Sequence, residues 1–216
     1  MEQRALTIGR IGCLAVSTLL CALMAFSAGA ETFTVTKESD DDGPCEVDDC
    51  ALREAILAAN ATPGNDLVVV PGGTYQLSLL GPVEENQSMT GDLDVLDDLE
   101  ILGDQERPVF IVGDGTGRVL QIYESTVIIS NVTITGGNAS SWGGGIRTSH
   151  SRVTIIDSTI TGNSNSMSGG GILAGSYEMT LINCTVSRNT THEHGGGIFR
   201  FGIADSRGCA GKSYDY

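Results

Sequence analysis

The second half of the chain repeats itself at a fixed interval of 26 residues. The segment Gly143-Gly144-Gly145-Ile146 recurs as residues 169–172 and again as residues 195–198. The text between these copies keeps its register, because similar residues recur in columns one period apart. The columns are Val127, Val153 and Met179; Ile129, Ile155 and Leu181; Ile134, Ile160 and Val186; and Thr133, Thr159 and Thr185. A fixed period with this many matched columns is the sequence signature of a solenoid.

The spacing of apolar residues inside one repeat indicates which solenoid forms. Val127 and Ile129 lie two residues apart, as do Val132 and Ile134, and Thr occupies alternate positions. An alternation of period two, rich in Val, Ile and Thr, predicts strands with one buried face. Helical repeats need a period of about 3.6, and a propeller blade needs about 40 residues. We therefore expect an all-β fold, a parallel β-helix whose coils stack about 4.8 Å apart.

The glycine triplets have a structural explanation in such a fold. Each coil must turn sharply, and glycine adopts positive φ at little cost. Stacked glycines also let the backbones of adjacent coils approach closely. The alternative is calcium binding as in nonapeptide repeats, which need an Asp shortly after the glycine pair. Ile follows each triplet instead, so we favour the structural role.

The first thirty residues have the layout of a secretory signal peptide. Arg4 and Arg10 precede an apolar run over residues 11–26, and residues 27–30 supply small side chains before a cleavage site. The alternative is an uncleaved membrane anchor, but the run is shorter than the roughly 20 residues of a membrane span. No other stretch is long and apolar enough to span a membrane. We therefore predict that residues 1–30 are removed and that the mature chain is exported.

Residues 31–66 precede the repeats and predict a cap for the open N-terminal end of the solenoid. Thr32 to Thr36 alternates like a strand, and an acidic loop follows it. A helix is expected over residues 49–62, with Asp48 or Asp49 suited to the N-cap and a Pro-Gly pair suited to end it. The apolar face of this helix consists of Leu52, Ala55, Ile56 and Ala59. Because a solenoid exposes its core at each end, this helix can cover the first coil.

The coils are expected to occupy residues 67–202. Leu67 to Val70 and Thr74 to Leu77 flank a Pro-Gly-Gly turn, which predicts strand, turn and strand of the first coil. Nineteen of the 27 acidic residues lie between residues 31 and 107, while the later part of the chain is neutral. The formal net charge of −15 argues against nucleic-acid binding, which needs clustered Lys and Arg against phosphate.

The segment Cys50-Ala51-Leu52-Arg53-Glu54-Ala55-Ile56, called the hallmark segment below, resembles the hallmark of the CSLREA-type N-terminal region. Ala51 stands where that family usually has Ser. Residues 66–75 and 91–95 and the glycine repeats are similar to the same group of secreted bacterial proteins, and the resemblance covers roughly residues 32–202. It implies a right-handed parallel β-helix of the pectin-lyase-like fold, and export. It also implies a place at the cell surface or outer membrane in adhesin-like proteins, and no catalytic residues.

Four cysteines follow the signal segment: Cys45, Cys50, Cys184 and Cys209. An exported chain meets oxidising conditions, so we favour a disulfide between Cys45 and Cys50 over two free thiols. Cys184 shares a column with Val132 and Ser158, which predicts a small core residue. Cys209 lies beyond the regular pattern and is predicted to be a free thiol.

The loop before the predicted helix is rich in acids that could hold a calcium ion through their carboxylate oxygens. The candidate ligands are Asp40, Asp41, Asp42, Asp48 and Asp49. They do not match the ligand spacing of an EF-hand, and we favour the alternative of a solvated acidic loop that aids solubility. Apart from this candidate we expect no metal and no cofactor.

Two histidines, His192 and His194, lie on one side of any extended segment. A zinc site needs a third or fourth ligand. His150 belongs to a different column, and the neighbouring coil carries Ser at both positions. We therefore predict a surface turn here.

Two classes of function fit a parallel β-helix: a polysaccharide-active enzyme and a non-catalytic scaffold. Glycoside hydrolysis needs two carboxylates roughly 5–10 Å apart. The coils offer Asp157, which has Asn131 and Asn183 as its column neighbours. Glu124 and Glu178 are isolated, so no carboxylate pair is expected.

A lyase would instead use a basic side chain beside a calcium-loaded acidic cluster. Arg147 and Arg152 lie near no such cluster in the sequence. The outer columns of Thr, Ser and Asn form a polar ladder suited to weak contacts with glycans. We therefore expect no catalytic residues and favour an adhesin-like scaffold contacting polysaccharides or cell-surface glycans over a lyase or glycoside hydrolase.

Residues 203–216 break the repeat. The apolar alternation stops after Phe201, and small residues fall where the preceding coil has Ile182 to Thr185. No cap follows, so the last coil would expose a β edge. We predict an irregular tail that belongs to a truncated or frame-shifted product of a longer gene.

Overall fold

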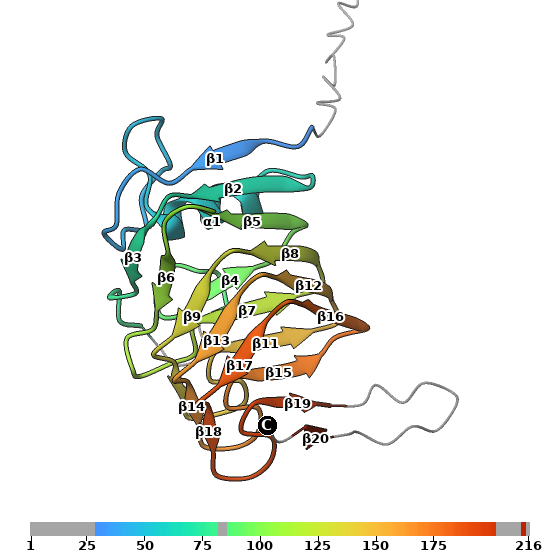
Figure 1. Cartoon of the computed structure of the whole chain (residues 1–216). Coiled ribbons are helices and arrows are strands. Elements are labelled where there is room, and N and C mark those ends of the chain that lie inside the picture. Colours follow the sequence, from blue (N-terminus) through green and yellow to red (C-terminus); the bar gives the residue numbers. More distant parts are fainter. Residues whose placement is uncertain (1–28, 82–85, 202–212, 215–216) are drawn as a thin grey trace, which may run out of the picture.

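The computed structural model describes residues 29–81, 86–201 and 213–214 of the 216-residue chain. Parallel strands stack along one axis as a β-solenoid of about four turns, with about 26 residues per coil and one short helix (Figure 1). The all-β parallel fold predicted from the repeat is confirmed. The arrangement follows from the sequence, because no single coil can bury its own apolar face without a neighbour.

Four sheets run along the axis in the described residues, and each is named here after one of its strands. The β8 sheet contains β1 (Thr32–Thr34), β2 (Asp66–Val70), β5 (Leu99–Gly103), β8 (Thr126–Ser130), β12 (Arg152–Ile156) and β16 (Glu178–Ile182). The β9 sheet contains β3 (Gly73–Gln76), β6 (Val109–Val112), β9 (Thr133–Thr135), β13 (Thr159–Thr161) and β17 (Thr185–Ser187). The β10 sheet contains β10 (Asn138–Ala139), β14 (Ser164–Asn165) and β18 (Thr190–Thr191). The β11 sheet contains β4 (Leu93–Val95), β7 (Leu120–Tyr123), β11 (Ile146–Ser149), β15 (Ile172–Gly175), β19 (Ile198–Arg200) and β20 (Ser213–Tyr214).

Strand pairing reproduces the predicted columns. β12 pairs with β8 on one side and β16 on the other, so that Val153 lies between Val127 and Met179. One ladder of the β11 sheet consists of Leu93, Leu120, Ile146, Ile172 and Ile198. Most of these side chains are buried in one continuous core, because each coil covers the apolar face of its neighbour.

The glycine triplets fill both predicted roles. Gly143, Gly169 and Gly195 adopt φ angles of 71°, 75° and 66°, a region that favours glycine. The second glycine of a triplet faces the next coil at close range: a Cβ on Gly144 would lie 2.2 Å from the carbonyl oxygen of Ser164. Any larger residue would therefore force adjacent coils apart.

Polar side chains in the turns also bond from coil to coil, which the repeat alone did not indicate. Asn163 Nδ2 donates to Asn189 Oδ1 at 3.1 Å and to the carbonyl oxygen of Ile134 at 3.1 Å. Asn189 repeats the pattern one coil later, donating to the carbonyl oxygen of Ile160 at 2.9 Å. These bonds join the turn after β13 to β9, and the turn after β17 to β13, so each turn is held to the preceding coil.

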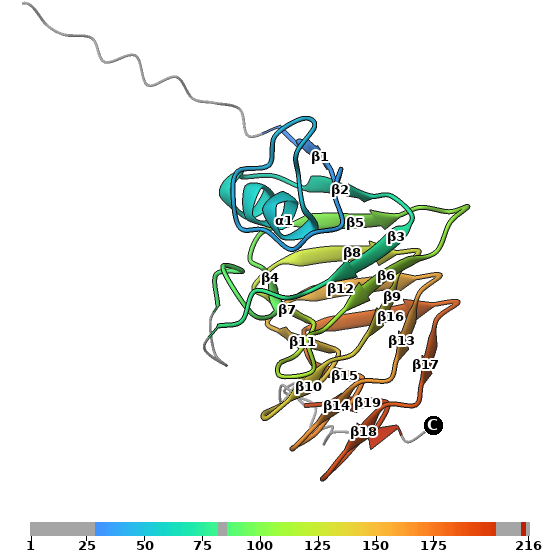
Figure 2. The ribbon, with the colours of Figure 1, turned by 90° about the vertical axis from the view of Figure 1, so that its left-hand side faces the viewer.

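The single described helix, α1 (Leu52–Ala61), lies at the N-terminal end of the solenoid, over β4 and beside β2 (Figure 2). Its predicted apolar face is buried in the common core: Leu52, Ala55, Ile56 and Ala59. The two larger side chains, Leu52 and Ile56, each contribute on the order of 1.5–3 kcal/mol through their burial. The helix therefore covers the first coil as the sequence predicted.

The predicted N-cap of this helix was wrong. The cap residue is Ala51, not Asp48 or Asp49, and its methyl side chain accepts no hydrogen bond. Asp49 is occupied elsewhere, in an ion pair of 2.6 Å with Lys37. Glu54 instead accepts the backbone N–H of Ala51 at 2.6 Å, which is one half of a capping box.

The two ends of the chain are only partly described. Residues 1–28, most of the predicted signal peptide, lie outside the described residues, as does Cys209. Within the predicted irregular tail, Ser213–Tyr214 forms β20, which pairs antiparallel with β19. Across the described parts of the chain, no helix combines the length and apolarity needed to cross a membrane.

Candidate functional site

The outer face of the β11 sheet carries a hollow of about 320 Å³, called the aromatic hollow below. Its lining comes from β11, β15, the residues next to β11 and the residue after β19: Trp142, Arg147, Thr148, Ser149, His150, Leu173, Gly175 and Phe201. Two aromatic rings, one guanidinium group and several hydrogen-bonding groups thus meet on one side of the solenoid. Such a mixed lining is typical of small-molecule sites.

The hollow forms because one outward column has small residues in its middle. Tyr123, Ser149 and Gly175 occupy matching positions on β7, β11 and β15, and Phe201 follows one period later. Ser and Gly leave space that the aromatic residues at either end of the column do not fill. Leu173, buried in the adjacent outward column, provides an apolar floor.

Two large rings border the hollow and remain open to solvent. Trp142 is 40% exposed and Phe201 is 64% exposed. The guanidinium carbon of Arg147 lies 5.9 Å from the centre of the Trp142 ring, within the range of a cation–π contact. Arg147 Nη1 also donates to Gln121 Oε1 at 3.5 Å, so the guanidinium group contacts both Gln121 of the neighbouring strand β7 and the Trp142 ring.

A row of aromatic rings runs along the axis beside the hollow. His150 lies between Tyr123 and Tyr177, with ring centres 6.0 Å apart in both pairs and edge-to-face geometry. His150 Nδ1 is 3.0 Å from the hydroxyl of Ser149. The hydrogen bond of Tyr123 with Glu124 raises the pKa of its phenol. The row therefore extends the aromatic surface over three coils.

The predicted threonine columns lie on the outer face of the β9 sheet. Thr159 pairs with Thr133 and Thr185, and Thr161 pairs with Ser187. Most of these side chains are half-exposed. The column continues to Phe110 of β6, which pairs with Thr133 and is 37% exposed, so this face offers a ladder of hydroxyl groups next to one aromatic ring.

A second hollow of about 240 Å³ brings together carboxylates that the sequence left apart. Asp157, which had no acidic neighbour in its column, lines it together with Asp104 and Glu106. Backbone N–H groups of Glu106 and Arg107 lower the pKa of Asp104 to about 2. A general acid for glycoside hydrolysis needs a raised pKa, so Asp104 is tuned in the opposite direction.

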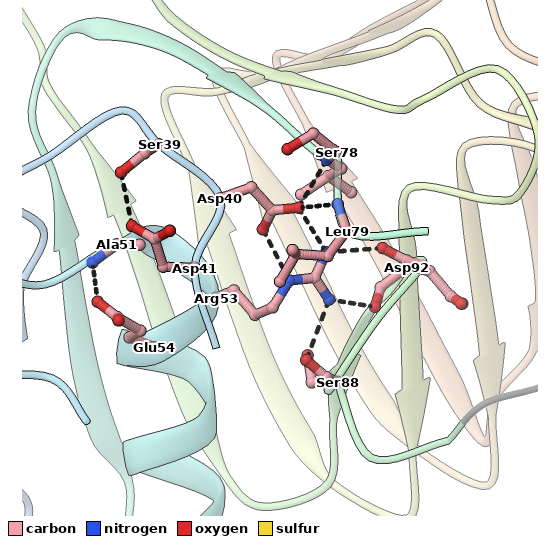
Figure 3. Close-up of polar contacts among 12 residues, drawn as sticks. Ser39, Asp40, Asp41, Ala51, Arg53, Glu54, Ser78, Leu79, Ser88 and Asp92 are labelled. Atoms are coloured by element: carbon pink, nitrogen blue, oxygen red, sulfur yellow. Dashed lines mark hydrogen bonds and ion pairs between the residues drawn. The ribbon is translucent and has the colours of Figure 1, made fainter. Parts of the chain in front are cut away.

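The hallmark segment centres on Arg53, which is 0% exposed (Figure 3). Its Nε and Nη2 bond the two carboxylate oxygens of Asp40 at 2.7 and 3.1 Å. Nη1 and Nη2 also donate to three backbone carbonyl oxygens, those of Ser88, Gly91 and Asp92, at 2.7–3.1 Å. This fork joins the acidic loop and the segment before β4 to the helix.

Asp40 is buried like Arg53, since its side chain is only 3% exposed. Besides Arg53, its Oδ2 accepts the backbone N–H groups of Ser78 and Leu79 at 2.6 and 2.9 Å. Asp41 and Asp49 both pair with Lys37, at 3.0 and 2.6 Å. Three of the five candidate calcium ligands therefore lie in ion pairs.

Lys37 also reaches the buried Glu54, at 3.2 Å. Its hydrogen bond with Asp49, followed by the one with Asp41, raises the pKa of the Lys37 ammonium group. The hydrogen bond from Ser39 lowers the pKa of Asp41. Within the described residues, no group of three or more His, Cys, Asp or Glu side chains is arranged to hold a metal ion.

The predicted disulfide between Cys45 and Cys50 is present, with an S–S distance of 2.05 Å. It closes the acidic loop directly before α1, and Cys50 is fully buried. Cys184 is a free thiol packed against the core, in line with its predicted column. Its Sγ lies 3.3 Å from the carbonyl oxygens of Ile155 and Ile182.

The two neighbouring histidines make separate contacts. His192 Nδ1 lies 3.3 Å from the carbonyl oxygen of Asn165. The ring of His194 stacks on Phe199 with centres 6.1 Å apart. His150 belongs to the row beside the aromatic hollow, so the three histidines are spread over different contacts.

Sequence reasoning missed the aromatic hollow because each of its residues looks ordinary in isolation. Two signals were available: Trp142 is the only tryptophan of the chain, and the outward column of Tyr123 is interrupted by Ser149 and Gly175. Both gain meaning only when strand register shows which residues share a face.

Because comparison with known proteins gives no match, the function must be inferred from the fold and the site alone. No family model, no curated protein and no solved structure matches this chain. The class that the structure itself defines is a parallel β-solenoid with a disulfide-bonded N-terminal cap.

Proposed function

We propose that the protein is a non-catalytic, exported scaffold of the cell surface, adhesin-like, that contacts glycans through the outer face of its coils. The observation that carries this proposal is the aromatic hollow, where Trp142 and Phe201 stand open to solvent beside Arg147. A sugar ring presents an apolar C–H face and a rim of hydroxyl groups. Aromatic rings next to hydrogen-bond donors match both features.

The rigidity of the coils supports a binding role of this kind. Binding groups on stacked strands lose little freedom when a ligand arrives, so less of the contact energy is spent on ordering. Trp142, Leu173 and Phe201 come from three successive coils that are joined by backbone hydrogen bonds. A polymer can contact several of them at once.

The resemblance of the hallmark segment to the CSLREA-type region of pectin-lyase-like β-helix proteins supports the same proposal. Export is supported by the signal-like layout of residues 1–30, and the disulfide of Cys45 and Cys50 fits an oxidising compartment. The lowered pKa of Asp104 argues against this one carboxyl group as a general acid.

The test combines binding and catalysis on one purified sample. The chain is applied to an array of immobilised glycans, and release of reducing and unsaturated sugar ends is measured in parallel. Binding without release supports the scaffold. Release of ends would identify a polysaccharide lyase or glycoside hydrolase instead, and absence of binding to any glycan would contradict the proposal.

A further inference from the structure

We infer that the aromatic hollow takes neutral polysaccharides, with the apolar face of one sugar ring against Trp142 and Phe201. This inference rests on the proposed glycan contact and names its ligand class. The hollow of about 320 Å³ lies at the lower end of the range for small-molecule sites, about 300–1,000 Å³. It therefore suits one short stretch of a polymer whose remainder stays in solvent.

Charge distinguishes a neutral ligand from an acidic one. Among the described residues that line the hollow, Arg147 is the only one with a permanent charge. Its guanidinium group already faces the Trp142 ring and donates to Gln121. The chain as a whole has a formal net charge of −15, which repels polyanions at long range, but its excess acids lie before residue 108 and the part that carries the hollow is neutral.

The hydrogen-bonding groups of the hollow also suit hydroxyls. The hydroxyl of Ser149 and the ring of His150 lie together, 3.0 Å apart, at the edge of the space left by Gly175. Both groups donate and accept, as sugar hydroxyls do. Thr148 is buried and bonds Ser176, so its hydroxyl belongs to the protein interior.

Trp142 gives the experiment a direct readout. Because Trp142 is the only tryptophan of the chain, all tryptophan fluorescence comes from the hollow. The full chain is titrated with neutral β-linked hexose oligosaccharides and, separately, with oligogalacturonate of the same length. We expect a saturable blue shift with the neutral series and none with the acidic one.

Three variants locate the site. Trp142→Ala is expected to weaken binding at least about ten-fold in native affinity electrophoresis through a neutral glucan, as for an aromatic anchor. Trp142→Phe, which keeps a ring, should retain part of the affinity, and Phe201→Ala should reduce the fluorescence response. Thr159→Val, on the β9 sheet, is the matched control and should bind like the unaltered chain.

The remaining outcomes refute the ligand class, the site or the glycan contact itself. A blue shift with oligogalacturonate would refute the neutral class. Retardation by a glycan that leaves Trp142 emission unchanged, with Trp142→Ala unaffected, would refute this site but preserve the proposed glycan contact. No response to any glycan in either assay would refute both. Circular dichroism of each variant confirms that the coils are intact.

Discussion

Replacing Arg53 with Met tests whether the hallmark segment closes the end of the solenoid. The change keeps a long unbranched side chain and removes the guanidinium group. It leaves Asp40, with a side chain only 3% exposed, without its cation. It also leaves the carbonyl groups of Ser88, Gly91 and Asp92 without their donor.

The expected magnitude follows from burial. Removing one partner of a buried ion pair costs about 3–5 kcal/mol, because the remaining charge is buried without compensation. A protein of this kind unfolds with a total of about 5–15 kcal/mol, so the loss is a large share of its stability. In urea, with a slope of about 2 kcal/mol per molar, the unfolding midpoint should fall by about 2 M.

Urea unfolding followed by far-UV circular dichroism measures this shift. Arg107→Met is the matched control, since Arg107 forms an ion pair with Asp104 while its side chain stays 65% exposed. An exposed pair contributes little, so the control should move the midpoint far less. Equal shifts in both variants, or a loss below about 1 kcal/mol for Arg53→Met, would refute the role of burial.

A double substitution separates charge from packing. Removing both partners, Arg53→Met with Asp40→Leu, takes away the uncompensated charge and should recover part of the stability lost by Arg53→Met alone. A double variant as unstable as the sum of the two single variants would show that the two side chains act independently.

Four further predictions follow from the described contacts. Ala51→Ser should raise the stability by about 1 kcal/mol in the same urea assay, because a hydroxyl at the N-cap completes the capping box; no gain would place the helix start elsewhere. Gly144→Ala should lower the thermal midpoint markedly, since its Cβ would lie 2.2 Å from the Ser164 carbonyl oxygen, and an unchanged midpoint would contradict the close approach of the coils. The pKa of Asp104 is lowered from 3.8 to about 2, so its contribution is complete above about pH 4 and is lost as the pH falls toward 2. Asp104→Asn should therefore lower the thermal midpoint at pH 6 and leave it unchanged at pH 2, and an equal loss at both would contradict the assignment. Calcium and its chelation should leave the thermal midpoint unchanged, because three of the five candidate ligands, Asp40, Asp41 and Asp49, already lie in ion pairs; a rise with calcium would restore the loop as a metal site.

The sequence predicted the coil register well because backbone hydrogen bonds between coils permit one alignment. A strand shifted by one residue would turn its whole apolar column to solvent. Val127, Val153 and Met179 therefore had to stack, and they do. The disulfide of Cys45 and Cys50 was predicted because these two cysteines lie five residues apart and the chain was expected to meet oxidising conditions.

What the sequence could not predict depends on contacts between coils and cap. Asp49 is a good N-cap by local preference, but Lys37 draws its carboxylate away from the helix. Asp104 and Asp157 are 53 positions apart, and only the stacking of their coils brings them to one hollow. The aromatic hollow likewise arises from small residues opposite large ones on different strands.

The contacts of the hallmark segment explain why such residue types stand together. Cys50 closes a loop, Leu52 and Ile56 fill the core, Arg53 joins three chain segments, and Glu54 holds the helix start. Every one of these side chains is committed to structure, so none is available to a substrate. At the other end, Met179 and Leu181 occupy the columns of buried residues yet are only half-buried, because no described coil follows them. The contrast shows what the cap supplies, which is coverage of the apolar face that a first coil would otherwise expose.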